Sequence, residues 1–299
     1  MYESPLAYLL GLEGLALLRT FTGEHDREFA EARVAEIRRL LDDASLADAA
    51  VDVARVRTSE GYRIWSRTYD GPNTAFDLDE PVLGEILDGL SPGVALDAAC
   101  GTGRLAALLA RRGHRVLGVD SSPEMLGRAR ARVPDGTFHL GDLHRLPVAD
   151  AAVDLAVCSL ALTHVPDLHP VMAEFARVLR PGGHLLTSDI HPERVLRGAV
   201  PPVCLPDGRP GRLESHRHAT GDYLRAALAA GLQVRRCEEP VAPTGEPPGP
   251  QEPPRTPTTE PGPWEVWPWS LAELVPDAAA AANAGVPAEI IWHFQRTAP

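Results

Sequence analysis

The strongest constraint on the fold is a regular alternation of short apolar runs with helical segments, which begins at residue 94. The helical segments carry clear start signals, such as Ser122 followed by Pro123. Short apolar runs of this kind fit strands that are buried on both faces of a parallel sheet. The runs are Val94–Ala98, Arg115–Asp120, Thr137–Leu140, Ala152–Leu160 and His184–Ile190. Strands that alternate with helices predict βαβ units, and therefore an α/β fold with a doubly wound sheet.

Two more strands are expected near the end of the chain, at Leu232–Arg236 and Ile290–Gln295, the first after a helix at Gly221–Ala230. Residues 240 to 263 between them are crowded with proline and poor in apolar residues, which predicts a loop. Three indoles follow this loop and either line a pocket or dock the loop onto the sheet. They are Trp264, Trp267 and Trp269.

Residues 4 to 44 have the periodicity of helices. One apolar stripe at helical spacing consists of Ala30, Val34, Ile37, Leu41 and Ala44. We therefore expect residues 1–58 to be a helical N-terminal extension that serves as a lid or a dimer contact. Residues 59–299 are expected to form the main domain, with insertions at 191–220 and 240–287.

Composition excludes several classes of function. The chain of 299 residues has a net charge of -12, which argues against a nucleic-acid partner. It contains no lysine, so it has neither a Schiff-base lysine for pyridoxal phosphate chemistry nor the lysine of a P-loop. Its four cysteines form no Cys-x-x-Cys pair, which argues against a thiolate zinc site.

The most apolar early stretch, Leu6 to Leu18, contains Glu13 and is too short to span a bilayer. No basic segment precedes it, and Glu3 stands where a signal peptide would carry positive charge. We therefore expect a cytoplasmic protein without a membrane partner.

The first expected strand runs into a glycine turn at Gly101 and Gly103, directly before a helix. Glycines there let a ligand approach the backbone N–H groups at the helix N-terminus. With Ala106 the turn also fits the dinucleotide fingerprint, so the turn alone does not select a cofactor. Asp97, four residues before the first glycine, would repel a pyrophosphate and attract an amino group.

Two further acids lie at the ends of the next strands. Asp120 ends the second strand, where a carboxylate accepts hydrogen bonds from ribose hydroxyls. Asp142 follows Gly141 at the end of the third strand, where a carboxylate suits the exocyclic amine of adenine. With Asp97, these acids match a cofactor that has an amino group, a ribose and an adenine but no phosphate. The sequence therefore predicts S-adenosylmethionine.

Four stretches resemble the successive motifs of class I methyltransferases, and the nearest subgroup includes the ubiquinone and menaquinone biosynthesis methyltransferases. They are Asp97-Ala-Ala-Cys-Gly-Thr-Gly103, Gly118-Val-Asp-Ser-Ser-Pro-Glu-Met125, Gly141-Asp142 and Leu179-Arg-Pro-Gly-Gly183. The similarity covers about 59–236 and the last strand at 289–296. It implies a seven-stranded sheet of order 3-2-1-4-5-7-6 with strand 7 antiparallel. The implied reaction is transfer of a methyl group to a small molecule.

The resemblance also implies that Tyr62 and Tyr69 lie near the methionine carboxylate, and that Ser159 and Leu160 lie under the sulfonium. The motifs and the resemblance together give one set of expected cofactor-binding residues. This set is Tyr62, Tyr69, Asp97, Ala98, Gly101, Thr102, Gly103, Asp120, Ser121, Met125, Gly141, Asp142, Leu143 and Ser159.

His164 follows the fourth strand and is the candidate catalytic residue, as a general base. His191, His216 and His218 are weaker candidates, and a lone histidine is more often structural. Methyl transfer depends mainly on positioning, so a base is not required. The chain has two asparagines and no Asp–Asn cluster, and we expect no metal ion.

Two alternatives stay open beside the enzyme. One is an S-adenosylmethionine-binding protein without turnover, and the other is an NAD-dependent oxidoreductase, which Asp97 and the missing lysine disfavour. The acceptor, its attacking atom (O, N or C) and the oligomeric state, including a possible homodimer, do not follow from the sequence.

Overall fold

The computed structural model describes residues 1–67, 69–71, 74–242 and 269–298. The chain divides into two compact units. Unit 1 consists of Met1–Val56, Pro202–Arg212 and the described part of Pro243–Val286, and unit 2 consists of Arg57–Pro201, Leu213–Ala242 and Pro287–Pro299. Residues 1–56 of the predicted N-terminal extension and parts of both predicted insertions thus belong to one unit, while Arg57 and Thr58 belong to the other. Its role as a lid or a dimer contact stays a prediction.

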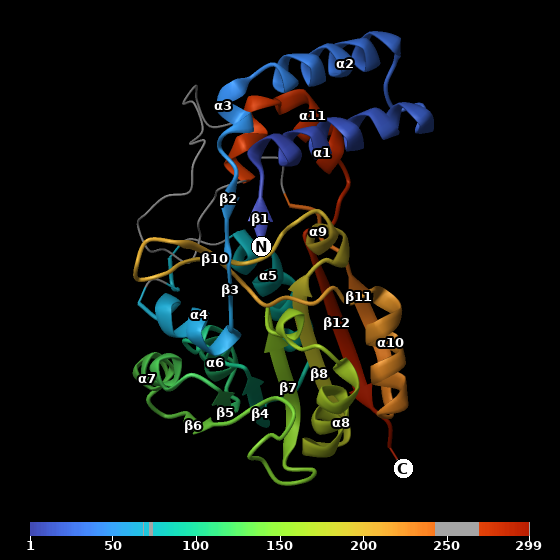
Figure 1. The fold of residues 1–299 in the computed structure, drawn as a ribbon. Helices are drawn as coiled ribbons and strands as arrows, with labels where there is room; N and C mark the ends of the chain where they lie inside the picture. The colour runs from blue at the N-terminus through green and yellow to red at the C-terminus, as the bar shows by residue number, and fades with distance from the viewer. Residues whose placement is uncertain (68, 72–73, 243–268, 299) are drawn as a thin grey trace. The chain divides into compact units, whose positions relative to one another are not determined.

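Unit 2 contains a seven-stranded sheet with helices on both faces (Figure 1). Its strands are β4 (Val94–Ala98), β5 (Arg115–Asp120), β6 (Thr137–Leu140), β7 (Val153–Ser159), β8 (Leu179–Ile190), β11 (Leu232–Glu238) and β12 (Glu289–Arg296). They lie in the order β6-β5-β4-β7-β8-β12-β11, and β12 is antiparallel to both of its neighbours. Both the predicted fold class and the predicted strand order are confirmed.

The two faces of this sheet carry separate apolar cores. The helices of unit 2 are α4 (Thr58–Trp65), α5 (Thr74–Asp88), α6 (Arg104–Arg111), α7 (Pro123–Arg132), α8 (Leu168–Val178), α9 (Pro192–Leu196) and α10 (Thr220–Ala229), with a 3-10 turn η2 (Leu162–His164). Phe175 of α8 and Tyr223 of α10 belong to the core on one face. Leu87 of α5, Leu109 of α6 and Leu126 of α7 belong to the core on the other.

Local signals set the helices that begin at the strand ends. Helix α7 begins at Pro123, and the Ser122 hydroxyl caps it by accepting the Met125 N–H at 3.2 Å, as predicted. Helix α6 follows Gly103, whose φ of 81° favours glycine. A Cβ atom at Gly103 would also come within 3.0 Å of the Ala129 Cα atom, so the residue permits close packing of α6 against α7.

Strand β8 differs from its prediction, because it begins at Leu179 and not at His184. Helix α8 ends at Val178, and the Pro181-Gly182-Gly183 stretch lies inside the strand. Its register against β7 shifts there, from Val153 beside Leu179 to Leu155 beside His184. The chain therefore becomes extended before the glycines and not after them.

Unit 1 is a helical cluster with two small sheets. It contains α1 (Pro5–Leu18), η1 (Arg19–Thr22), α2 (Arg27–Leu41), α3 (Ala44–Ala47), η3 (Trp269–Leu274) and α11 (Pro276–Asn283). The small sheets are β1 (Tyr2–Glu3) with β2 (Val51–Asp52), and β3 (Ala54–Val56) with β10 (Pro210–Leu213) and β9 (Pro202–Cys204). Its core joins Leu9 and Leu12 of α1 to Leu40, Leu271 and Ala278.

The apolar stripe predicted on α2 is not its buried face. Val34 is 38% and Leu41 57% exposed, whereas Leu40 and Arg33 are buried. Arg33 reaches the buried carboxylate of Glu13 at 3.4 Å, and this ion pair belongs to the side of α2 that faces the core. Because the charged residue Arg33 occupies a core position, the periodicity of apolar residues did not identify the buried face of α2.

A second buried arginine, Arg212, links the two small sheets of unit 1 through an ion pair. Arg212 is 2% exposed and donates to both carboxylate oxygens of Glu3, at 2.9 and 2.8 Å. Its guanidinium also lies 5.1 Å from the centre of the Trp269 ring.

Trp264, Trp267 and the proline-rich stretch up to 263 lie outside the described residues, apart from the stretch's first three positions. No helix in the described part of the chain has the length and apolar character needed to cross a membrane.

Candidate active site

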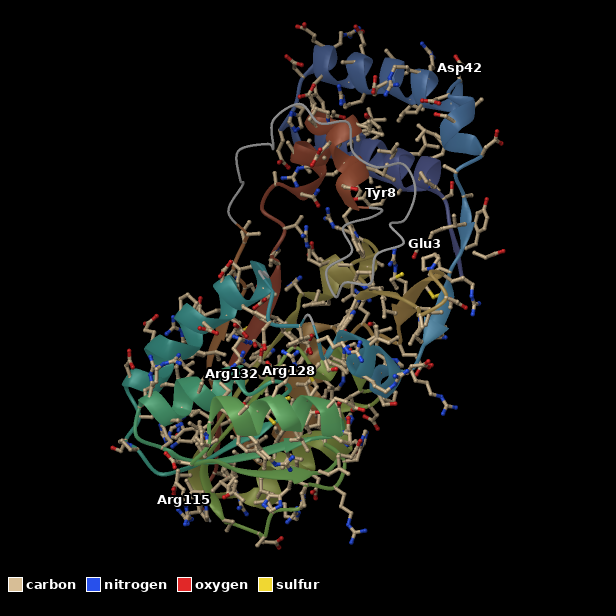
Figure 2. All side chains as sticks on the ribbon, turned by 90° about the vertical axis from the view of Figure 1, so that its left-hand side faces the viewer. Glu3, Tyr8, Asp42, Arg115, Arg128 and Arg132 are labelled. Atoms are coloured by element: carbon tan, nitrogen blue, oxygen red, sulfur yellow. The ribbon has the colours of Figure 1, made fainter. Side chains whose placement is uncertain are left out.

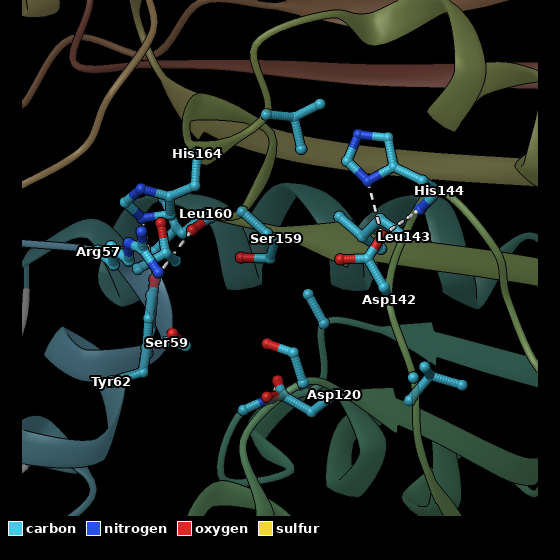
Figure 3. Close-up of a pocket in the computed structure, with 18 of the residues that line it drawn as sticks. Arg57, Ser59, Tyr62, Asp120, Asp142, Leu143, His144, Ser159, Leu160 and His164 are labelled. Atoms are coloured by element: carbon cyan, nitrogen blue, oxygen red, sulfur yellow. Dashed lines mark hydrogen bonds and ion pairs between the residues drawn. The ribbon is translucent and has the colours of Figure 1, made fainter.

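A cavity of about 360 Å³ opens at the carboxyl ends of β4, β5, β6 and β7 within unit 2 (Figure 3). Ligands of open α/β sheets bind at this edge, where the loops that follow the strands meet. The cavity is lined by Arg57, Thr58, Ser59, Tyr62, Tyr69, Ala99, Gly101, Val119, Asp120, Ser121, Gly141, Asp142, Leu143, His144, Ser159, Leu160, Ala161, His164, Val165 and Glu214.

Two non-glycine residues on the cavity wall have left-handed backbone conformations. Ala99 follows β4 with a φ of 57°, and Leu160 follows β7 with a φ of 53°. Such conformations cost about 1–3 kcal/mol and cluster at functional sites. Both turns redirect the chain where a strand ends, which brings the backbone to the cavity and leaves the space above the sheet edge open.

The Asp120 carboxylate is fixed by the backbone on both sides. Its Oδ2 accepts the Gly101 N–H and its Oδ1 accepts the Ser122 N–H, each at 2.8 Å. Burial raises the pKa of this carboxyl, and the backbone donors oppose that shift. A carboxylate has about four acceptor positions, so two remain for a ligand. The glycine turn and the end of β5 thus hold the Asp120 carboxylate in a fixed orientation in the cavity, where it can accept hydrogen bonds from a ligand.

Asp142 lies on the far side of the cavity from Tyr62 and is largely exposed (Figure 3). Its Oδ1 accepts the His144 N–H at 2.8 Å and lies 2.6 Å from the His144 Nδ1. Leu143 lines the cavity beside them. This corner offers a carboxylate oxygen, an imidazole and an apolar side chain, a combination that suits the edge and the face of an aromatic base.

Asp97 lies beneath the glycine turn. Its side chain is 2% exposed, and its Oδ2 accepts the Ala106 N–H of α6 at 2.7 Å. Burial raises the pKa of Asp97 to about 7. Together with Thr102 and Arg104 it lines a much smaller cavity, which shares Tyr69, Ala99, Gly101 and Ser159 with the large one. Asp97 therefore braces the start of α6 at the edge of the predicted cofactor site.

Tyr62 and Tyr69 form an aromatic wall with Trp65 and Phe76. The rings of Tyr62 and Tyr69 are 5.9 Å apart, and that of Tyr69 lies 5.7 Å from Phe76. Burial raises the pKa of both tyrosine hydroxyls well above the usual value, so both stay protonated. The wall supplies aromatic faces and neutral hydroxyl groups.

His164 is held in one orientation between two partners. Its Nδ1 lies 2.7 Å from the Glu214 carbonyl oxygen, which can only accept, so Nδ1 carries the proton. Its Nε2 lies 3.2 Å from the Tyr62 hydroxyl and is the unprotonated nitrogen of the neutral ring. Burial lowers the pKa of His164 below its usual value. The cavity thus contains a neutral imidazole whose basic nitrogen lies on the Tyr62 side.

A buried polar network lies under Ser159 at the end of β7. Asp79 of α5 is fully buried and accepts hydrogen bonds from the Ser159 and Ser188 hydroxyls at 2.6 and 2.8 Å. Arg104 pairs with both Asp79 oxygens at 2.8 and 2.9 Å and donates to the Ser159 hydroxyl at 2.8 Å. This network fixes the rotamer of Ser159 at the middle of the cavity wall.

A second network anchors the glycine turn near the surface of unit 2. The Thr102 hydroxyl donates to Asp70 at 2.6 Å and accepts from Arg132 at 3.0 Å. Arg128 and Arg132, which both project from α7, also pair with Asp70, at 3.5 and 2.9 Å (Figure 2). Thr102 is buried by these contacts, so its side chain supports the turn and does not face the large cavity.

The large cavity brings together most of the residues that the sequence predicted. The predicted residues that line it are Tyr62, Tyr69, Gly101, Asp120, Ser121, Gly141, Asp142, Leu143, Ser159 and His164. Asp97 and Thr102 line the small cavity, while Ala98, Gly103 and Met125 line neither. Ala98 and Met125 are fully buried in the packing behind the turn.

Sequence reasoning missed several lining residues, above all Arg57, Thr58, Ser59 and Glu214. A weak signal existed for the first three, because they directly precede the Tyr62 stretch that the family resemblance had singled out. No local signal marked Glu214, since it reaches the cavity through a loop that starts far from the motifs. No local signal marked Asp79 either, since it stands between the acids Asp77 and Glu80 in α5.

The weaker histidine candidates have structural roles or lie elsewhere. His218 Nε2 contacts the carbonyl oxygens of Leu162 and Val165 at 3.1 and 2.7 Å, which ties the loop before α10 to η2. His191 caps α9 by accepting the Glu193 N–H at 3.2 Å. His216 lines a different surface cavity. Among the residues that the structure describes, no group of three or more His, Cys, Asp or Glu side chains is arranged to hold a metal ion.

Comparisons with known proteins bear on this site. Residues 96–187 match the sequence model of a family described as a methyltransferase domain. The malonyl-[acyl-carrier protein] O-methyltransferase of Serratia marcescens is 40% identical over 115 residues, which are 38% of this chain and 44% of that protein. The demethylmenaquinone methyltransferase of Chlorobaculum parvum is 44% identical over 89 residues, 29% of this chain and 37% of that protein. The chain thus spans less than half the length of these curated relatives.

One solved structure has the same fold as this chain. It is an S-adenosylmethionine dependent methyltransferase from Mesorhizobium loti, with a TM-score of 0.51 and 23% sequence identity. The match covers 73% of this chain and 97% of that one.

Proposed function

We propose that this protein binds S-adenosylmethionine in the large cavity and transfers its methyl group to a small molecule, because residues 96–187 match a methyltransferase domain, as the sequence motifs predicted. The observation that carries the proposal is the placement of Asp120 and Asp142 at successive strand ends of one cavity, with His164 across it. The attacking atom of the acceptor is O, N or C in this proposal, and identifying the acceptor would establish which of the three it is.

The residues of the cavity fit this cofactor. Two acceptor positions remain on Asp120 after its bonds to Gly101 and Ser122, one on each carboxylate oxygen, which suits a pair of ribose hydroxyls. Asp142 and Leu143 suit the amine and the face of adenine. No lysine or arginine lines this side of the cavity to neutralise a pyrophosphate, which disfavours NAD.

When bound, the cofactor supplies a methyl group on a positively charged sulfur that is displaced in line by a nucleophile. The C–S bond breaks as the bond between methyl carbon and nucleophile forms, and the sulfur leaves with the electron pair. The protein's main contribution is geometry, since holding two reactants in line can supply roughly 7–11 kcal/mol of the barrier. The Asp79–Arg104–Ser159 network gives the centre of the cavity wall the rigidity that this requires.

His164 is the proposed general base for an acceptor hydroxyl. Its Nε2 is unprotonated in the neutral ring, and the hydrogen bond of Nδ1 to Glu214 stabilises the ring once Nε2 has taken a proton. A general base adds about 10²–10⁴-fold in rate, which is less than positioning supplies. An amine acceptor that is already deprotonated would need no base.

Two sequence-based expectations remain proposals at this point. Methyl transfer is expected to proceed without a divalent metal, and unit 1 is expected to act as a lid for the acceptor or as a dimer contact. The first is checked by turnover after dialysis against EDTA, and the second by the oligomeric state in light scattering together with acceptor kinetics.

The decisive experiment is calorimetric titration of the purified chain with S-adenosylmethionine, S-adenosylhomocysteine and NADH. We expect the first two to bind at micromolar concentration and NADH not to bind. Incubation with labelled S-adenosylmethionine and small-molecule extracts then tests turnover. Binding without any labelled product would favour the alternative of a cofactor-binding protein without turnover, and NADH binding alone would refute the proposal.

A further inference from the structure

The cavity has two ends with different chemistry (Figure 3). Asp120 and Asp142 lie at one end, which the proposed cofactor would occupy. Arg57, Ser59 and His164 lie at the other, with Ser159 between the two groups. The second end is the part of the cavity that is left for the methyl acceptor.

Arg57 is the only lysine or arginine among the described residues that line the cavity. It precedes the first residue of α4, which fixes its backbone at the cavity wall, and its side chain is exposed. Within the described part of the chain it forms no hydrogen bond or ion pair through its guanidinium, unlike Arg104, Arg128 and Arg132 nearby. Its five donors are therefore available to a ligand.

Neutral donors and acceptors surround this cation. The Thr58 and Ser59 hydroxyls line the same end, and His164 is neutral there because burial lowers its pKa. Glu214 is the one carboxylate among the described residues of this end, and it has interactions of its own. The acceptor end therefore offers one unpaired positive charge with hydroxyl groups beside it.

We propose that the methyl acceptor is a small organic acid and that Arg57 binds its carboxylate. This inference rests on the proposed function, because it assigns the acceptor end from the position of the cofactor. A guanidinium presents a planar pair of N–H donors that matches a carboxylate in two-point geometry. An acid held there presents the rest of its molecule to Ser159 and to the basic Nε2 of His164.

The cofactor's own carboxylate is the competing ligand for Arg57. Arg57 lies on the His164 side of Ser159, whereas the glycine turn at Gly101 lies with Asp120. A cofactor oriented by Asp120 and Asp142 would run past Gly101, so its carboxylate would first meet Tyr69, whose ring lies beside Gly101. The two assignments are separable, because only the competing one predicts that an Arg57 substitution weakens cofactor binding.

The test compares acids with their uncharged amides as ligands. Benzoate with benzamide, 4-hydroxybenzoate with 4-hydroxybenzamide, and hexanoate with hexanamide are titrated into the full-length protein, with and without saturating S-adenosylhomocysteine, and followed by ligand-observed NMR. Loss of a charge-assisted hydrogen bond costs about 1.5–3 kcal/mol, so we expect at least one acid to bind about 10-fold more tightly than its amide. Arg57→Gln should abolish that preference and leave the affinity for S-adenosylhomocysteine nearly unchanged.

Arg63→Gln is the matched control, because it removes the same charge from the same helix at an exposed position outside the cavity. It should keep the acid preference. The proposal is overturned if every amide binds as well as its acid, if the preference survives Arg57→Gln, or if that substitution instead weakens S-adenosylhomocysteine about 10-fold or more. Absence of S-adenosylhomocysteine binding to the unaltered protein would contradict the proposed function, while the arm without it still reports on the acid preference.

Discussion

Asp79 and Arg104 form a two-point ion pair beneath the cavity, with N–O distances of 2.8 and 2.9 Å, although 25 residues separate them in the chain. Asp79 is fully buried, and the Ser159 and Ser188 hydroxyls complete its hydrogen bonds. The pair joins α5 to the first residue of α6, so it links the helix layer to the end of the glycine turn.

Asp79→Asn should lower the free energy of unfolding by about 3 kcal/mol, because removing one partner of a buried pair leaves a poorly compensated charge. The Glu80 carboxylate, 3.1 Å from Arg104, still compensates part of its charge, so we expect a loss near the lower end of the range usual for broken buried ion pairs. Urea unfolding measures the change. The control is Asp88→Asn, which breaks an exposed pair with Arg112 and should cost less than about 1 kcal/mol. Equal losses in the two variants would contradict a special role for the buried pair.

Asp120→Ala should weaken the binding of S-adenosylmethionine and S-adenosylhomocysteine by roughly 10–150-fold, since hydrogen bonds to a charged acceptor contribute about 1.5–3 kcal/mol. Asp120→Asn keeps one acceptor oxygen and should lose less. Asp135→Ala, at an exposed position outside the cavity, is the control for the loss of one charge. Unchanged affinity of the alanine variant in calorimetry would remove Asp120 from the cofactor site.

His164→Gln should lower kcat by about 10²–10⁴-fold if the acceptor atom is a hydroxyl oxygen. Because burial lowers the pKa of His164, the neutral, basic form persists below pH 6.5. Thus kcat should rise with pH through a pKa below 6.5 and stay level above it. The variant should lose this dependence, and His169→Gln, at an exposed position, should keep it. A kcat that is the same in the His164 variant would show that positioning alone supports the reaction.

Glu289 carries a buried carboxyl whose two oxygens have no hydrogen-bond partner among the described residues, and burial raises its pKa to about 9. The folded state keeps the proton while the unfolded chain releases it near pH 4.5, so folding takes up a proton between these values. This contribution to stability is therefore complete below about pH 4.5 and declines as the pH rises toward 9.

Glu289→Gln keeps the shape of the side chain and removes its proton equilibrium. One pKa unit corresponds to about 1.4 kcal/mol, so at pH 8 the variant should be at least about 1 kcal/mol more stable than the unaltered protein. Near pH 5 the difference should shrink or change sign. Thermal or urea unfolding across this pH range measures both. A difference that is independent of pH would show that Glu289 is ionised in the folded protein.

Local patterns were enough for the sheet and for most residues at the proposed cofactor end of the cavity. The apolar runs, the Ser122 cap and the glycine turn each depend on neighbouring residues, and an acid at the end of a strand, such as Asp120, reaches the sheet edge wherever the strand lies. The family resemblance supplied the strand order, which periodicity does not contain.

The proposed acceptor end and the contacts that support the cavity depended on the tertiary structure. Arg57, His164 and Glu214 come from three distant segments, and the partner of Arg104 was one of 41 acidic residues with no pattern to single it out. The buried face of α2 likewise follows from the pairing of Arg33 with Glu13. The sequence by itself determined the elements and the ends of the strands, because those depend on short-range sterics and burial. Only the folded chain decided which charges meet, because the energy of a buried charge depends on the partner that packing brings to it.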